Sequence, residues 1–340
     1  MQKFFILLFV SLGYLSFAQK VHFETLLEDK ISIRALQIND GKVFYTGTDS
    51  KFGYVNLKDT ADKKQIKLFY KNLQFRTLGQ NKNAFYAINI ESPAYFFKIE
   101  KKSLKAKLVF TDTVKSAFYD ALHFGKDGFG IALSDPNGTK AAISTFKKNW
   151  DRWQKCAEGC LPDFHVGEAA FAASNSNIAS SKKYMWFATG GMSSRIFRQN
   201  IKTCTWEIFE TPFIQRTSST GMYSLDFLDD NFGIAVGGDY TKQAENINNI
   251  ATTNDAGKTW QIQASGKNGG YKTCVKFRPK FKGKDIIAVG DQNIEFSNDY
   301  GKTWKIISEE KGLYVCEWID ENTVVFAGRN RIVKMEFMLL

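Results

Sequence analysis

A short pattern recurs seven times along the chain and constrains the fold more than any other feature of the sequence. Each copy is an apolar run of strand length that ends in small residues and is followed by a polar one. The copies occupy residues 43–49, 84–91, 129–136, 185–191, 232–239, 285–291 and 323–329. A second strand-like phrase precedes every copy, as "MYSLDFL" precedes "FGIAVGGD". Repeats of about 40–50 residues indicate an array of similar structural units.

The pattern predicts four antiparallel strands in each unit, joined by a turn, a loop and a hairpin. Abundant β-branched and aromatic residues favour strands over helices. Four-stranded units repeated around an axis are the blades of a β-propeller. We therefore expect an all-β, seven-bladed β-propeller. The segment "KVHFETL" at residues 20–26 alternates like a strand, so we expect it to complete the last blade and close the ring.

One nine-residue phrase occurs twice, as "TTNDAGKTW" at 252–260 and "FSNDYGKTW" at 296–304. Its Asp and Gly are turn residues, because the carboxylate accepts backbone hydrogen bonds and glycine tolerates positive φ. A phosphate-binding loop is excluded, since Thr252 and Phe296 stand where its first glycine is required. We expect both phrases to be structural hairpins built on Asp255, Gly257, Trp260, Asp299, Gly301 and Trp304.

The first 18 residues have the pattern of a secretory signal peptide. Lys3 is followed by an apolar run from Phe4 to Phe17 and by the small residue Ala18. The run is shorter than a typical membrane-spanning helix. We expect cleavage near Ala18, a single domain over residues 19–340, and a location in the periplasm or outside the cell.

The charge and the cysteine content of the chain limit the kinds of ligand, disulfide and metal site that can be expected. The chain has 46 basic and 35 acidic residues, and most of the basic ones are lysine, which favours a solvated surface. An exported chain without a nucleic-acid-binding signature is expected to bind a protein or a glycan instead, as a monomer. Cys156 and Cys160 are the best candidates for a local disulfide. The three histidines have no metal-ligand spacing, so we expect no metal and no cofactor.

The segments Thr253–Trp260 and Ser297–Trp304 match S/T-x-D-x-G-x-T-W, which is the Asp-box or BNR repeat of sialidase-like propellers. The chain from Lys20 to Leu340 also resembles exported bacterial propellers of the photosystem II stability and assembly factor-like family. Phrases similar to "GIALSDP", "EAAFAASNS", "GGDY" and "NNIATT" carry that resemblance. It implies a propeller with Asp-box hairpins and a binding or assembly role.

The order of strands in a blade places the repeated hairpins on one face of the ring. The first strands of the blades begin on the opposite face, where the loops between second and third strands also lie. We expect a ligand or partner to bind there, and Tyr223 and Lys272 are among the strand starts. The predicted binding residues are Arg34, Arg76, Asp120, Asp135, Glu168, Arg195, Asp239 and Tyr240.

The favoured function is therefore an exported, non-catalytic propeller that binds a protein or a glycan through this face. The alternative is a glycoside hydrolase of the sialidase-like type, since such enzymes need two carboxyl groups and Asp120 with Glu168 could supply them. The R-I-P phrase expected near the first arginine of a sialidase is absent, because this chain has "SIRALQ". In a third interpretation, the polar residues only hydrogen-bond loops and water in the central channel.

Overall fold

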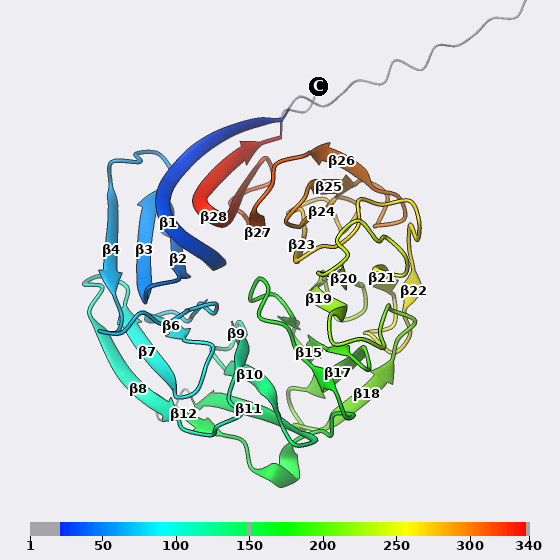
Figure 1. Ribbon diagram of the computed structural model, residues 1–340, viewed down its shortest axis with the longest axis horizontal. Coiled ribbons are helices and arrows are strands. Elements are labelled where there is room, and N and C mark those ends of the chain that lie inside the picture. The colour runs from blue at the N-terminus through cyan, green and yellow to red at the C-terminus, as the bar shows by residue number, and fades with distance from the viewer. Residues whose placement is uncertain (1–20, 148–150, 338–340) are drawn as a thin grey trace, which may run out of the picture.

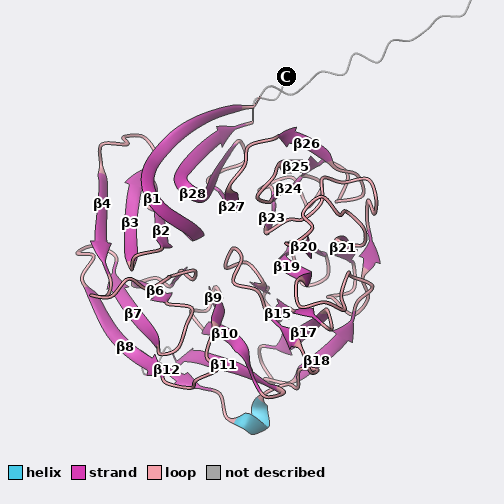
Figure 2. Cartoon of the chain, viewed as in Figure 1, coloured by secondary structure: helices cyan, strands magenta, loops and turns pink. Residues whose placement is uncertain are grey.

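The computed structural model describes residues 21–147 and 151–337, which fold into β-sheets arranged around a central axis (Figure 1). Strands and loops make up almost all of this part of the chain, and a short 3-10 turn, η2 (Glu158–Cys160), is the helical element in it (Figure 2). The predicted signal peptide lies outside the described residues. None of the helical segments in the described ranges is long and apolar enough to cross a membrane.

Four of the sheets have four strands each. They are formed by β5 (Gly79–Gln80), β6 (Ala84–Ile88), β7 (Ala94–Glu100) and β8 (Ala106–Asp112); by β9 (Tyr119–Phe124), β10 (Gly130–Asn137), β11 (Lys140–Lys147) and β12 (Arg152–Lys155); by β14 (Ile178–Ser180), β15 (Tyr184–Ala188), β17 (Arg195–Asn200) and β18 (Trp206–Glu210); and by β23 (Cys274–Phe277), β24 (Ile286–Val289), β25 (Ile294–Ser297) and β26 (Lys305–Ser308).

Two further sheets have six strands each. One has the order β13 (Glu168–Ala169), β16 (Gly190–Gly191), β19 (Thr220–Phe227), β20 (Gly233–Asp239), β21 (Ile250–Thr253) and β22 (Gln261–Ile262). The other has the order β27 (Leu313–Trp318), β28 (Thr323–Glu336), β1 (His22–Asn39), β2 (Lys42–Gly47), β3 (Lys51–Asn56) and β4 (Lys63–Lys67), so it joins the two ends of the described chain.

The prediction of seven blades is wrong, because the described strands form six sheets. The difference arises from β1, an 18-residue strand whose first half pairs with β28 and whose second half pairs with β2. Its pairing with β28 shifts register between Glu28 and Ser32, and Figure 1 shows the strand as one long curve. The units expected as first and last are therefore one continuous sheet of a six-bladed propeller. Over its described part, the segment 20–26 does pair with β28, as its strand alternation predicted.

Glycines near the end of several repeated phrases are required by close packing between strands. A side-chain carbon on Gly237 would lie 2.0 Å from the carbonyl oxygen of Gly221, and one on Gly328 would lie 1.9 Å from that of Gly312. These distances are far below van der Waals contact, so any larger residue would force the two strands apart. The small residues of the repeated pattern are therefore found where the inner strands come too close together for a larger side chain.

Hydrophobic side chains fill the space between neighbouring sheets. Trp186 on β15 stacks on Phe227 of β19, with ring centroids 3.7 Å apart, and Trp260 meets the same Phe227 edge-on. Trp304 packs in a cluster with Ile234 and other residues of β20 and β24. The tryptophans of both repeated phrases are 7% exposed, so each one holds its hairpin against the core.

The five cysteines are all free in the structure, including Cys156 and Cys160. The candidate local disulfide is therefore not formed in the structure. The Cys156 thiol turns inward toward Thr145 of β11, while Cys160 is exposed on the 3-10 turn. Cys274 and Cys316 are buried on the innermost strands of adjacent sheets, with their sulfur atoms 3.8 Å apart.

Candidate functional site

The two repeated hairpins connect the last two strands of their sheets, β21 with β22 and β25 with β26, at the periphery of the ring. Oδ1 of Asp255 accepts hydrogen bonds from the Thr259 N–H and the Thr253 hydroxyl, both at 2.9 Å, and Oδ2 accepts one from the Thr259 hydroxyl at 2.7 Å. Gly257 has φ of +82°, and its carbonyl accepts the Trp260 indole N–H at 3.0 Å. The polar side chains of this turn are therefore satisfied within the turn itself.

The second hairpin repeats this arrangement. Oδ1 of Asp299 accepts bonds from the Thr303 N–H and the Ser297 hydroxyl, both at 2.9 Å, and the Trp304 indole donates to the Gly301 carbonyl at 2.9 Å. Burial acts to raise the pKa of Asp299, but the hydrogen bonds from Thr303 and Ser297 outweigh it and hold that pKa below its ordinary value. These hydrogen bonds stabilise the turn and leave no acceptor of Asp299 free for a ligand.

The candidate site is a central cavity of about 570 Å³, which we call the funnel. Side chains from sheets on different sides of the ring converge on it, because the inner strands all approach the axis there. Five of the eight predicted binding residues line it, namely Arg34, Arg76, Asp120, Asp135 and Tyr240. Its volume lies within the range of about 300–1,000 Å³ that is usual for ligand pockets.

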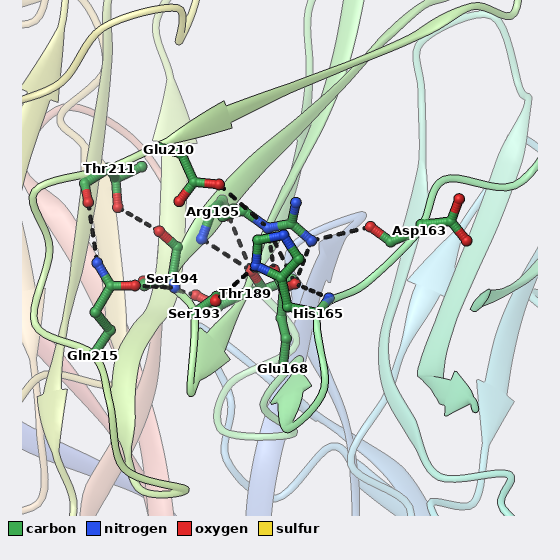
Figure 3. Close-up of polar contacts among 10 residues, drawn as sticks. All are labelled: Asp163, His165, Glu168, Thr189, Ser193, Ser194, Arg195, Glu210, Thr211 and Gln215. Atoms are coloured by element: carbon green, nitrogen blue, oxygen red, sulfur yellow. Dashed lines mark hydrogen bonds and ion pairs between the residues drawn. The ribbon is translucent and has the colours of Figure 1, made fainter. Parts of the chain in front are cut away.

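Glu168 and Arg195 do not line the funnel but form a buried ion pair beside it (Figure 3). The Arg195 Nε donates to both carboxylate oxygens of Glu168, at 3.0 and 3.1 Å, and its Nη2 also contacts Glu168 and the Asp163 carbonyl. The Thr189 hydroxyl donates a further bond to Glu168 at 2.5 Å. Because the charges of Glu168 and Arg195 neutralise each other in this buried pair, the two residues hold the local loops together and are not free to bind a ligand.

Asp239 and Lys272 are also occupied by partners within the fold. Oδ1 of Asp239 accepts the Thr241 N–H at 2.9 Å and the Thr241 hydroxyl at 2.7 Å. Lys272 forms a fully buried ion pair with Glu295 at 2.7 Å. Its neighbour Tyr271 lines the funnel instead. Tyr271 and Lys272 lie just before β23, and a difference of one position there separates the funnel from the core.

Aromatic rings form much of the funnel wall. Tyr223 stacks on Phe171 with ring centroids 4.0 Å apart and meets Tyr271 edge-on. The Arg34 guanidinium lies 4.1 Å above the ring of Tyr314, while its Nη1 donates to the carbonyl of Ala173 at 2.9 Å. The sequence did not single out Phe171, Tyr271 and Tyr314, although the two tyrosines begin strand-like phrases equivalent to that of Tyr223.

The two inner arginines of the funnel have no carboxylate partner among the described residues. Nη2 of Arg76 donates to the Gln74 side chain at 2.9 Å, and Arg34 is bonded to a backbone carbonyl. Burial, followed by the neighbouring charge of Arg34, lowers the pKa of Arg76. Two guanidinium groups therefore face the funnel without full charge compensation.

Asp120 and Asp135 lie side by side on the funnel wall, and most of their carboxylate oxygens lack a hydrogen-bond partner. Asp120 is fully buried, and both of its carboxylate oxygens, together with Oδ1 of Asp135, lack a hydrogen-bond partner in the described structure. Burial raises the pKa of Asp135 to about 6. Burial first, and then the charge of Asp135, raise the pKa of Asp120 well above its ordinary range, against the opposing effect of Arg76. The N–H groups of Ala170 and Ala172 also oppose these rises without reaching hydrogen-bond geometry.

No metal centre is evident in residues 21–147 and 151–337, where no three His, Cys, Asp or Glu side chains converge on a point. The candidate site is therefore the funnel, with its aromatic wall, its two arginines that form no ion pair in the described structure, and its unpaired carboxylates. Glu168, which the catalytic alternative pairs with Asp120, lies outside this cavity and is held by Arg195.

Comparisons with known proteins point to the fold. No family profile matches the chain, and no curated protein matches it. A solved structure of YCF48 bound to a D1 peptide superposes with a TM-score of 0.66 and 12% identity, covering 96% of this chain and 99% of that one. A structure of U3-55K gives a TM-score of 0.65 at 10% identity, covering 92% and 98%. The RRP9 WD40 repeats give 0.65 at 10% identity, covering 93% and 97%. These similarities show a β-propeller fold.

Proposed function

We propose that this protein is an exported propeller that binds an extended segment of a partner protein in the funnel and performs no catalysis. One observation carries the proposal: aromatic and charged side chains from separate sheets meet in one cavity with part of their bonding capacity unused. Tyrosine and arginine are enriched where binding energy is concentrated in protein interfaces. The likeness to a propeller solved with a bound peptide supports a peptide-like ligand over other polar ligands.

The test compares two tyrosines that are similarly exposed but lie in different regions. Tyr240 lines the funnel and is 51% exposed, whereas Tyr300 lies in the second repeated hairpin and is 46% exposed. The purified protein would be incubated with an array of short peptides that samples each amino acid at each position. We expect selective binding that the Tyr240→Ala variant loses at least about tenfold, as for an aromatic residue at the centre of an interface. The Tyr300→Ala variant should bind like the wild type.

Two results would contradict the proposal. Binding that is lost equally in both tyrosine variants would place the interface elsewhere. Turnover of any member of a glycan panel, abolished by Asp120→Asn and by Glu168→Gln, would establish the glycoside hydrolase alternative. We expect no turnover, because the Glu168 carboxylate is held by Arg195 and Thr189 and does not share the funnel with Asp120.

We further propose that the chain belongs among the Asp-box, or BNR, propellers and that it is exported. The identical hydrogen-bond pattern of the two repeated hairpins supports the first point. The sequence pattern of residues 1–18 supports the second. The N-terminus of the protein recovered outside the cytoplasm should begin near Gln19, as mass spectrometry would show. Recovery of the uncleaved chain in the cytoplasm would contradict export.

A further inference from the structure

We propose that Asp120 and Asp135 form an acidic subsite of the funnel that binds a cationic side chain, lysine or arginine, of the partner segment. This inference rests on the proposed function and names the chemistry that part of the ligand must have. It starts from three buried carboxylate oxygens that the described structure leaves without partners.

The two aspartates are brought together by adjacent strands. Asp120 follows Tyr119 on β9, Asp135 follows Ser134 on β10, and Tyr119 pairs directly with Ser134. The Asp135 N–H bonds to the Phe118 carbonyl at 2.9 Å, which fixes the two chains beside each other. Asp135 is half-buried on the funnel wall, and Asp120 is fully buried next to it. A ligand in the funnel would meet Asp135 first, with Asp120 directly behind its contact surface.

The unpaired state of Asp120 requires an explanation, because buried polar groups are almost always hydrogen-bonded. A proton shared between the two carboxyl groups would create one hydrogen bond, which satisfies two oxygens and leaves the third unpaired. Arg76 is the cation that acts on Asp120, but its guanidinium is bonded to Gln74 and forms no ion pair with the aspartate. The fold itself therefore does not complete this site.

A cationic side chain has the donors that the site lacks. A lysine ammonium group carries three N–H donors and an arginine guanidinium carries five, whereas neutral side chains offer two at most. Hydrogen bonds between a cation and a carboxylate are also shorter and stronger than those between neutral groups. The adjoining segment 169–173 contributes only alanine and phenylalanine to the funnel, so it supplies no competing charge.

Binding of a cation should release a proton. In the free protein, burial raises the pKa of Asp135 to about 6, so this carboxyl group is partly protonated in mildly acidic solution. A ligand cation favours the ionised form, and the proton would leave to solvent. The other charged groups that face this pair are Arg76 and Arg34, with Glu91 beside Arg76. The affinity for a cationic peptide should therefore rise about tenfold from about pH 5 to about pH 7.

The experiment uses the full-length protein and the peptide array, with the variants Asp120→Asn and Asp135→Asn. Both substitutions keep the shape of the side chain and remove its charge. The Asp163→Asn variant is the control, because the Asp163 side chain is exposed and pairs with Lys140 away from the funnel. Peptides that bind the wild type should be enriched in lysine or arginine at one position. Both funnel variants should lose that preference and at least about tenfold in affinity, while the control retains both.

A matched change in the ligand keeps the test valid if a protein variant folds poorly. Replacing the preferred lysine of the best peptide by norleucine should weaken its binding to wild-type protein to a similar extent and remove the pH dependence. Binding without any cationic preference, or a preference that both Asn variants retain, would overturn the subsite while leaving the proposed function in place. If no peptide binds the wild type at all, the proposed function fails and the subsite fails with it.

Discussion

The repeated hairpins and the funnel both contain partly or fully buried aspartates. The two regions differ in how these aspartates are hydrogen-bonded and in the direction in which their pKa values are shifted. Asp255 and Asp299 accept several hydrogen bonds from their own turns, and these bonds hold both pKa values below the ordinary range despite burial. Asp120 accepts none of ordinary geometry, and burial raises its pKa. An unsatisfied buried carboxylate destabilises a fold, so its presence points to a role outside folding. The aspartates that are bonded within their own turns stabilise the protein, and the aspartates left unpaired form part of the candidate site.

The largest expected effect lies on the hairpin side of this comparison. Replacing Trp304 by alanine removes a buried ring and its hydrogen bond to Gly301. The free energy of unfolding should fall by about 3–5 kcal/mol, as for other buried aromatic residues. Urea unfolding would measure the loss, with Tyr240→Ala as a control that leaves stability nearly unchanged. A Trp304→Ala protein of wild-type stability would show that the hairpins do not hold the sheets together.

A smaller effect is expected from Asp299→Ala, which removes the acceptor of the second hairpin. The free energy of unfolding should fall by about 1–2 kcal/mol through lost turn hydrogen bonds. Because the pKa of Asp299 is lowered in the folded protein, its stabilisation is present at neutral pH and is lost as the pH falls through that lowered value. Peptide binding should be unchanged. A loss of binding at wild-type stability would assign the hairpin to the interface and break the distinction between the two regions.

The third expected effect has the opposite sign. The pKa of Asp135 in the folded protein is raised to about 6, above its value of 3.8 in a model peptide. The wild type therefore loses stability as the pH rises from about 4 to about 6, where its charged form becomes buried. A shift of this size corresponds to roughly 3 kcal/mol. Because Asp135 is only half-buried and its charge is partly screened by solvent, Asp135→Asn should be more stable at pH 7 by about 1–2 kcal/mol, with the difference absent at pH 4. Equal stability at both pH values would mean that the carboxylate is already compensated.

The sequence predicted the features that depend on local pattern. Strand alternation and the repeated small residues indicated an all-β propeller, and the turn residues of 252–260 and 296–304 indicated hairpins. The number of blades could not be obtained in the same way. Each of the seven phrases predicts a unit, but β1 continues without interruption from β28 to β2 and joins two of these units into one sheet. No local signal marks such continuity.

The candidate site was predictable only in part, because side-chain pairing over long sequence distances is invisible to pattern. Arg34, Arg76 and Asp120 reach the funnel as strand starts should. Glu168 meets Arg195 at a separation of 27 residues, and this contact removes both from the predicted site. Lys272 is buried in the core while the adjacent Tyr271 lines the funnel, and both lie just before β23, so the phrase alone did not indicate which of the two faces the cavity.

The most direct test of the central claim is a photo-cross-linking comparison between the two exposed tyrosines. A benzophenone amino acid would replace either Tyr240 in the funnel or Tyr300 in the hairpin, and the best peptide from the array would be added before irradiation. We expect a cross-link from position 240, competed by unlabelled peptide, and none from position 300. Cross-linking from position 300 with none from position 240 would contradict it, because the ligand would then lie on the hairpin side and not in the funnel.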